Sequence, residues 1–148
     1  MDYFICRECG NRKPMRDYVD ILEYEGICYG CYKQKPKHIC VDFDGVLAEY
    51  DGWRGPSVLG KPMEGAKDFL VQLVRMGYRV VVHTAREPLL IRNWLKEHGM
   101  FKLVSKVTKE KIPASAYIDD RAICFRGSFE DVLEAVKGFR PYWKKEGN

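Results

Sequence analysis

Residues 38–50 read HICVDFDGVLAEY, and this stretch decides how the rest of the chain is interpreted. Its first part, Ile39 to Phe43, has the apolar character of a buried strand. Two aspartates, Asp42 and Asp44, stand where that strand leaves the core, and Gly45 ends the run. A buried charge is costly unless a partner compensates it. The stretch therefore indicates a strand end with a positively charged partner beside two carboxylates.

After residue 37, short apolar runs alternate with segments of helical periodicity. Apolar side chains recur at helical spacing in the segment that opens at Pro62 to Glu64 and stops at Gly77, namely Ala66, Phe69, Leu70, Leu73 and Val74. Further helices are expected at 87–98 and 129–136, and strands at 39–43, 78–83, 103–107, 116–118 and 121–125. This alternation predicts an α/β fold, a Rossmann-like parallel sheet with helices on both faces.

Polar residues follow the predicted strands at their carboxyl ends, where open parallel sheets bind ligands. They are Asp42 and Asp44 after the first strand, His83, Thr84 and Arg86 after the second, and Asp119 and Asp120 after a later one. Several carboxylates at one rim repel each other, and a hard divalent cation relieves that repulsion. Mg²⁺ takes oxygen ligands of this kind, so it is the expected partner of the acidic residues.

Four of the six cysteines form two C-x-x-C pairs, Cys6 with Cys9 and Cys28 with Cys31, separated by residues 10–27. The spacing matches a four-cysteine site for structural Zn²⁺, in preference to disulfides, free thiols or a redox motif. Residues 1–36 contain few aliphatic side chains, so metal would supply their stability. We therefore expect a zinc-binding module at 1–36 and a second domain at 37–148. Cys40 and Cys124 lie in apolar runs and are interpreted as inert core residues.

Composition excludes several classes of protein. The 148 residues are 46% hydrophobic and 31% charged, with a net charge of +4 and no concentrated basic stripe. No apolar run is long enough to span a bilayer, and the N-terminus does not resemble a signal peptide, so we expect a cytoplasmic protein with no membrane partner. The aromatic tail RPYWKK is expected to pack Tyr142 and Trp143 onto the body.

Four motifs resemble those of the haloacid dehalogenase (HAD) superfamily of phosphotransferases, in the same order. They are DFDGVL at 42–47, VVVHTAR at 80–86, a lysine within KIPASAYIDDR at 111–121, and IDD at 118–120. Further segments, GWRG, Gly65-Ala66, IDDRAICF and FRPYWK, resemble small HAD proteins of phages and bacteria described as related to the phosphatase part of polynucleotide kinase. For a phage-encoded chain, the expected location is the host cytoplasm.

The resemblance implies a role for each acidic residue. Asp42 would attack phosphorus and form an aspartyl-phosphate, and Asp44 would act as general acid and then base. Mg²⁺ would be held by Asp42, the backbone carbonyl of Asp44, and Asp119, whereas Asp120 would anchor a lysine or a metal-bound water. A lone D-x-D is ordinarily a solvated turn, and the other motifs in order favour catalysis here.

Cationic and polar residues complete the implied site. Thr84 would donate its hydroxyl to a phosphate oxygen. Lys111 would neutralise the phosphate and orient Asp42, with Lys109 as the competing candidate. Arg86 either binds substrate or forms a structural ion pair, for example with Asp120.

The loop after the first motif carries Trp53 and Arg54, an aromatic next to a cation that suits stacking on a base. The alternative is that Trp53 packs on the body. The intervals 45–83 and 85–110 are too short for a cap domain, so the resemblance implies an open site suited to large substrates. The zinc module is one candidate for a lid.

Two functions follow from these features. The first is a Mg²⁺-dependent phosphatase acting through an aspartyl-phosphate on a phosphorylated substrate, such as a nucleotide or a nucleic-acid end. The second is a nucleic-acid or protein binding module, in which the zinc ribbon recognises the partner and the HAD-like body is a weakly active or inactive scaffold. The joint presence of Asp42, Asp44, Thr84, Lys111 and Asp119 favours the enzyme.

Overall fold

The structure is a computed structural model that describes residues 2–20 and 22–146. It divides into two compact units, Met1–Lys37 and His38–Asn148, and each is described by itself. The second unit has the predicted α/β fold, a four-stranded parallel sheet flanked by helices. No helix within the described ranges has the length and apolar character needed to cross a bilayer.

The N-terminal unit consists of short elements around the cysteines. Its elements are β1 (Tyr3–Ile5), β2 (Arg12–Pro14), β3 (Tyr18–Val19), β4 (Ile27–Cys28), the 3-10 helices Met15–Asp17 and Leu22–Tyr24, and helix α1 (Tyr29–Tyr32). Two antiparallel pairs form, β1 with β2 and β3 with β4. The buried cluster is small and includes two of the cysteines, Cys6 and Cys28, beside Val19, Tyr24 and Ile27.

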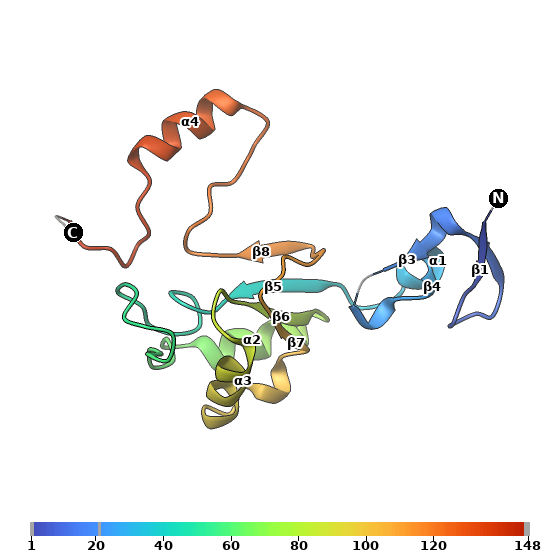
Figure 1. Cartoon of the computed structure of the whole chain (residues 1–148), viewed down its shortest axis with the longest axis horizontal. Coiled ribbons are helices and arrows are strands. Elements are labelled where there is room, and N and C mark those ends of the chain that lie inside the picture. Colours follow the sequence, from blue (N-terminus) through green and yellow to red (C-terminus); the bar gives the residue numbers. More distant parts are fainter. Residues whose placement is uncertain (1, 21, 147–148) are drawn as a thin grey trace. The chain divides into compact units, whose positions relative to one another are not determined.

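The sheet of the second unit has the order β7-β6-β5-β8, with every neighbouring pair parallel. Its strands are β5 (His38–Asp42), β6 (Arg79–His83), β7 (Lys106–Thr108) and β8 (Ala116–Ile118). Asp42 pairs with His83, His83 with Thr108, and Val41 with Ile118. The carboxyl ends of the four strands therefore meet at one edge, and Figure 1 shows the arrows of β5 and β8 pointing the same way.

Two amphipathic helices, α2 (Ala66–Arg75) and α3 (Pro88–Glu97), bury their apolar stripes in the main core. Leu70, Ile91 and Trp94 pack there with alternate residues of β5 and β6, such as Val41 and Val82. Because successive strand residues point to opposite faces, this core covers one face of the sheet. The Trp94 indole also donates to the carbonyl of Gly60 at 2.9 Å, which fixes the long loop between β5 and α2.

Three details of the sequence prediction were wrong. Residues 121–125 form no strand, because the Asp119 carboxylate accepts the N–H of Arg121 at 2.8 Å and turns the chain away from the sheet. Cys124 is consequently exposed instead of buried, whereas Cys40 on β5 is buried as predicted. Val74, expected on the inner face of α2, is also exposed.

The last helix, α4 (Phe129–Gly138), begins where predicted, and its N-terminus is capped by Ser128, whose hydroxyl accepts the N–H of Asp131 at 3.2 Å. None of its residues is buried. Its apolar side chains Phe129, Leu133 and Val136 are more than half exposed.

Candidate active site and metal centre

Three carboxylates gather at the carboxyl edge of the sheet. Asp42 ends β5, and Asp119 and Asp120 directly follow β8. An oxygen of each lies within 4.8 Å of the others, a grouping able to hold a metal ion. The parallel pairing of β5 with β8 accounts for this convergence, since Val41 is in register with Ile118.

The environment of Asp42 disfavours its charged form. Burial, a hydrogen bond that the protonated carboxyl donates to the side chain of Asp120, and the charge of Asp119 raise the pKa of Asp42 to about 8, against an opposing hydrogen bond from the Phe43 backbone. Like charges this close are unfavourable without a cation between them. Carboxylate oxygens are the donors that Mg²⁺ prefers, so the residues present fit that ion.

A cleft of about 430 Å³ opens over this acidic cluster. Its walls carry Asp44, Tyr50, Trp53, His83, Ala85 and Arg121 besides the three aspartates. The Nε2 atom of His83 is already engaged, because it lies 3.1 Å from the carbonyl oxygen of Lys109, within hydrogen-bond distance. Between Gly45 and His83 the described chain forms one loop, α2 and β6, and between Ala85 and Glu110 it forms α3, a 3-10 turn and β7. The cleft is therefore not covered by a cap from either interval.

Asp44 points to a different partner from the other aspartates. Its Oδ2 accepts the Arg86 Nε–H at 2.8 Å, and its buried Oδ1 has no hydrogen-bond partner among the described residues. Arg86 is itself only 3% exposed and also donates to the carbonyls of Gly55 and Pro56 at 2.9 and 3.0 Å. Arg86 therefore joins Asp44 to the Gly-rich loop.

The side chain of Trp53 is 60% exposed, and the Arg86 guanidinium lies 4.7 Å from its ring centroid. Trp53 is also one of the residues that line the cleft. The neighbouring Arg54 is paired with Asp51. Substrate contacts for Arg86, Trp53 and Arg54 stay predictions, and Arg86 forms its ion pair with Asp44, not with Asp120.

Thr84 follows β6 directly and is held there by hydrogen bonds, and its role in binding phosphate stays a prediction. It is 1% exposed, its N–H donates to the carbonyl of Thr108 at 3.0 Å, and its hydroxyl oxygen accepts the N–H of Arg86 at 3.0 Å. The hydroxyl still has a hydrogen to donate. It lies just ahead of α3, whose N-terminal N–H groups favour anions.

Neither candidate lysine forms an ion pair with the acidic cluster in the described structure. The ammonium of Lys109 pairs with Glu87, and that of Lys111 lies 4.8 Å from the ring centroid of Tyr117. The ammonium of Lys109 is therefore engaged by a carboxylate, whereas that of Lys111 makes a cation–π contact. The role of Lys111 stays a prediction.

The C-terminal tail contributes contacts that sequence reasoning did not assign to the site. Trp143 donates its indole N–H to the Asp120 carboxylate, and Tyr142 donates its hydroxyl to the carbonyl of Gly45. Arg121 lies over the rings of Trp143 and Tyr50, at 4.9 and 5.8 Å from their centroids. The aromatic tail motif was the available signal, and its packing on the body is confirmed, but its contact with the acidic cluster was missed.

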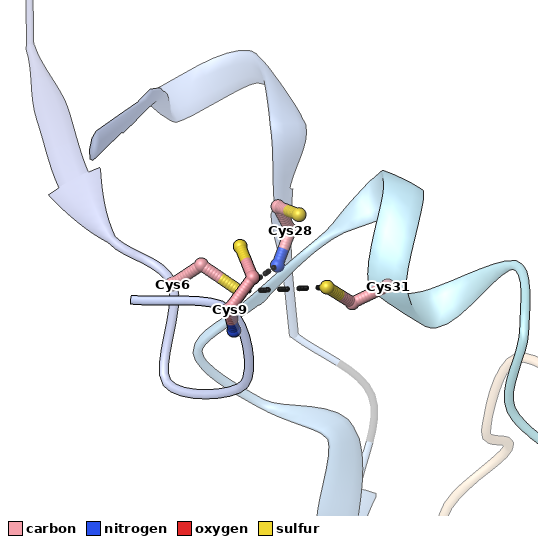
Figure 2. A group of neighbouring side chains, drawn as sticks. All are labelled: Cys6, Cys9, Cys28 and Cys31. Carbon is pink, nitrogen blue, oxygen red and sulfur yellow. Dashed lines mark hydrogen bonds between the residues drawn. The ribbon is translucent and has the colours of Figure 1, made fainter. Parts of the chain in front are cut away.

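The four predicted cysteines of the first unit converge around one point. Figure 2 shows their sulfur atoms turned toward a common centre, and all four lie within 4.8 Å of one another. The Cys6 and Cys31 sulfurs are 3.9 Å apart. Four thiolates about 2.3 Å from a tetrahedral zinc ion would be about 3.8 Å apart, so the Cys6–Cys31 separation matches such a site.

The local environment favours a thiolate at Cys6. Burial alone would raise its pKa, but hydrogen bonds from the backbone of Cys9, Cys28 and Glu8 outweigh that effect and lower the pKa to about 6. The N–H of Cys28 is 3.2 Å from the Cys6 sulfur. Hydrogen bonding to Cys28, together with burial, raises the pKa of Cys31 to about 12. The metal-free cluster therefore places a thiolate at Cys6 beside a protonated thiol at Cys31, which a bound cation would deprotonate.

Comparison with known proteins gives a limited result. No family model matches the chain, and no curated protein matches it. It resembles the solved structure of a conserved protein from Bacteroides thetaiotaomicron with 23% identity and a TM-score of 0.48, over 70% of this chain and 91% of that one. An uncharacterised protein from Listeria monocytogenes serotype 4b has 14% identity and a TM-score of 0.43, over 68% and 61%. At TM-scores below 0.5 these similarities carry no functional argument.

Proposed function

We propose that this chain is a Mg²⁺-dependent phosphomonoester hydrolase that works through an aspartyl-phosphate on Asp42. The observation that carries the proposal is the acidic cluster of Asp42, Asp119 and Asp120 under an open cleft at the carboxyl edge of a parallel sheet. The order of the four HAD-like motifs along the chain supports the same interpretation. When bound, Mg²⁺ would neutralise the carboxylates and the phosphate so that two anions can approach.

The residues divide the chemistry as follows. Asp42 attacks phosphorus through one carboxylate oxygen, and the bond from phosphorus to the leaving alcohol breaks. Asp44 supplies a proton to that alcohol and later takes one from the water that hydrolyses the aspartyl-phosphate. Its Oδ1 is the oxygen available for this transfer, because Oδ2 is engaged by Arg86. Thr84 donates its hydroxyl to a phosphate oxygen and Lys111 balances its charge.

Phosphate release from an aryl phosphate, with and without Mg²⁺, tests this function. We expect Asp42→Asn to abolish release while leaving the fold intact, since Asn keeps the shape but cannot attack. Asp68→Asn on α2 is the matched control, because Asp68 is exposed and makes no ion pair within the described chain. Unchanged turnover in the Asp42→Asn variant would rule out the nucleophile, and turnover independent of Mg²⁺ would rule out the metal.

For the first unit we propose a structural Zn²⁺ held by Cys6, Cys9, Cys28 and Cys31. The fit of their sulfur positions to a zinc tetrahedron supports it. Elemental analysis of the purified chain should give one zinc per molecule, and Cys28→Ser should lower that ratio markedly. A ratio near zero in the wild-type chain purified without chelator would contradict the proposal.

We further propose that the substrate is a phosphorylated nucleotide or nucleic-acid end. The support is that Trp53 is 60% exposed and lines the cleft, since an exposed aromatic ring can stack on a flat base. A panel of sugar phosphates, mononucleotides and phosphorylated oligonucleotides tests this proposal. Preference for sugar phosphates would count against it.

A further inference from the structure

A second cavity, of about 620 Å³, adjoins the acidic cleft. We call it the Arg121 cavity, and it is lined by Asp51, Gly52, Arg54, Arg121, Phe139, Pro141, Trp143, Lys144 and Lys145. Its one carboxylate, Asp51, is already paired with Arg54. The other three cations, Arg121, Lys144 and Lys145, form no ion pair with any described residue. The cavity therefore presents uncompensated positive charge.

Two residues connect this cavity to the acidic cluster. Arg121 lines both the cleft and the Arg121 cavity, and it follows Asp120 directly in the chain. Trp143 lines the cavity while its indole N–H is bonded to Asp120. The guanidinium of Arg121 lies beside the rings of Trp143 and Tyr50, which pack edge to face against each other, and it makes cation–π contacts with both. If the phosphate that is hydrolysed lies at Asp42, the neighbouring part of the substrate would lie near Arg121, because both residues line the same cleft.

We propose that the Arg121 cavity binds a second phosphate of the substrate, linked to the one that is hydrolysed. This inference rests on the proposed phosphatase function and narrows its substrate class to molecules carrying two phosphate groups, with a nucleic-acid end as the leading source. Arg121, Lys144 and Lys145 supply the charge that a phosphodiester requires. The rings of Trp143 and Phe139 supply flat apolar surface on which a base stacks.

The test compares kcat/KM for thymidine monophosphate, a thymidine bisphosphate and a terminally phosphorylated trinucleotide. We expect the two substrates with a second phosphate to exceed the monophosphate by about tenfold at low salt, with the advantage shrinking as NaCl rises. An advantage shared by the bisphosphate identifies the second phosphate itself as the recognised group. An advantage confined to the trinucleotide assigns the site to nucleic-acid ends, because the phosphodiester is then required.

The double variant Lys144→Ala/Lys145→Ala locates the effect. We expect it to reduce the ratio of kcat/KM between trinucleotide and monophosphate to about a third or less of the wild-type ratio. Lys102→Ala/Lys106→Ala removes the same charge from exposed positions outside the cavity and should leave that ratio unchanged. Equal kcat/KM for all three substrates in the wild type, or a ratio lowered equally by both double variants, would overturn the proposal.

A binding measurement separates this inference from the proposed function. Fluorescence anisotropy of a labelled, phosphorylated trinucleotide, recorded without Mg²⁺, reports the cavity without any turnover. We expect the Lys144→Ala/Lys145→Ala variant to bind it about fivefold more weakly than the Lys102→Ala/Lys106→Ala variant. A chain that binds in this pattern but hydrolyses nothing would refute the proposed phosphatase function and support the proposed phosphate site in the Arg121 cavity. If the chain hydrolyses aryl phosphate but both variants bind the trinucleotide equally, the phosphatase function is supported and the phosphate site in the Arg121 cavity is refuted.

Discussion

Gly45 is the residue at which the parts of the candidate site meet. Its φ is +80°, a conformation that favours glycine, and its carbonyl accepts the hydroxyl of Tyr142. A Cβ there would press on the Asp120 carboxylate and lie 3.0 Å from the Trp143 indole nitrogen. The D-x-D-G pattern thus needs its glycine for two reasons, the turn after β5 and the space that the Asp120–Trp143 pair occupies.

Gly45→Ala is expected to lower both stability and activity. The left-handed backbone alone should cost about 1–3 kcal/mol of unfolding free energy. Displacement of Asp120 should reduce phosphatase turnover by about 100-fold, as small misplacements in an active site do. Chemical denaturation and turnover measure the two effects.

Gly77→Ala is the matched control, because Gly77 has φ +91° but open space around the added Cβ. It should show the stability loss without the loss of turnover. Equal turnover in the two variants would show that the contacts of Gly45 with Asp120 and Trp143 do not matter.

The raised pKa of Asp42 predicts how the metal-free protein responds to pH. The folded pKa is about 8 against an ordinary value of 3.8, so between these limits the folded state holds a proton that the unfolded chain has released. Stability contributed by this group is therefore present below about pH 4 and is lost as pH rises toward 8. Comparison of melting temperatures with Asp42→Asn isolates this contribution, since Asn stays neutral.

In Mg²⁺-free buffer, the wild type should match Asp42→Asn near pH 4 and fall progressively below it toward pH 8. Added Mg²⁺ should restore the wild type at high pH, because the ion binds only the charged carboxylate. If the melting temperatures of the two proteins change with pH in parallel across this range, the raised pKa of Asp42 is contradicted.

Sequence reasoning brought Asp42 and Asp119 together correctly because it needed only strand order and the parallel rule. It could not place Asp44, whose partner Arg86 is distant in the chain, nor foresee that Trp143 bonds to Asp120. Those contacts depend on side-chain directions and on the return of the tail, which periodicity does not encode.

At the scale of elements, periodicity predicted α2, α3 and the central strands well, because their apolar stripes meet a buried surface. It failed at residues 121–125, where an apolar run follows an aspartate turn and finds no neighbouring strand. The same periodicity predicted α4 but said nothing about whether its apolar face is covered. A pattern reports which residues share a face, and the packing partner has to be found in three dimensions.

The exposure of α4 predicts that it is the least stable helix of the second unit. Isolated helices of about this length are marginal in water, and none of its residues is buried. Hydrogen exchange should therefore be faster at the amides of α4 than at those of α2 and α3, which have the same length and serve as internal controls. Protection of α4 equal to that of α2 would show that its apolar face is covered in solution.

At the scale of the whole molecule, the two units have different sources of stability. The second unit has a continuous core of aliphatic and aromatic side chains on one face of its sheet. Among its described residues, the first has a buried cluster of five, two of which are cysteines. A segment this small gains little from apolar burial, so we expect the proposed metal, held by the four cysteines, to supply most of its folding free energy.

Removal of the metal should therefore unfold one unit and spare the other. With a strong chelator of zinc, amides in β3, β4 and α1 should lose hydrogen-exchange protection, while those in β5 and β6 keep it. Cys28→Ser should produce the same pattern without chelator, because three thiolates hold zinc far more weakly than four. Cys124→Ser is the matched control, since Cys124 is exposed and outside the cluster. Loss of protection in β5 and β6 along with the first unit would show that the two units fold as one, and full protection of the first unit after zinc removal would show that its apolar cluster suffices.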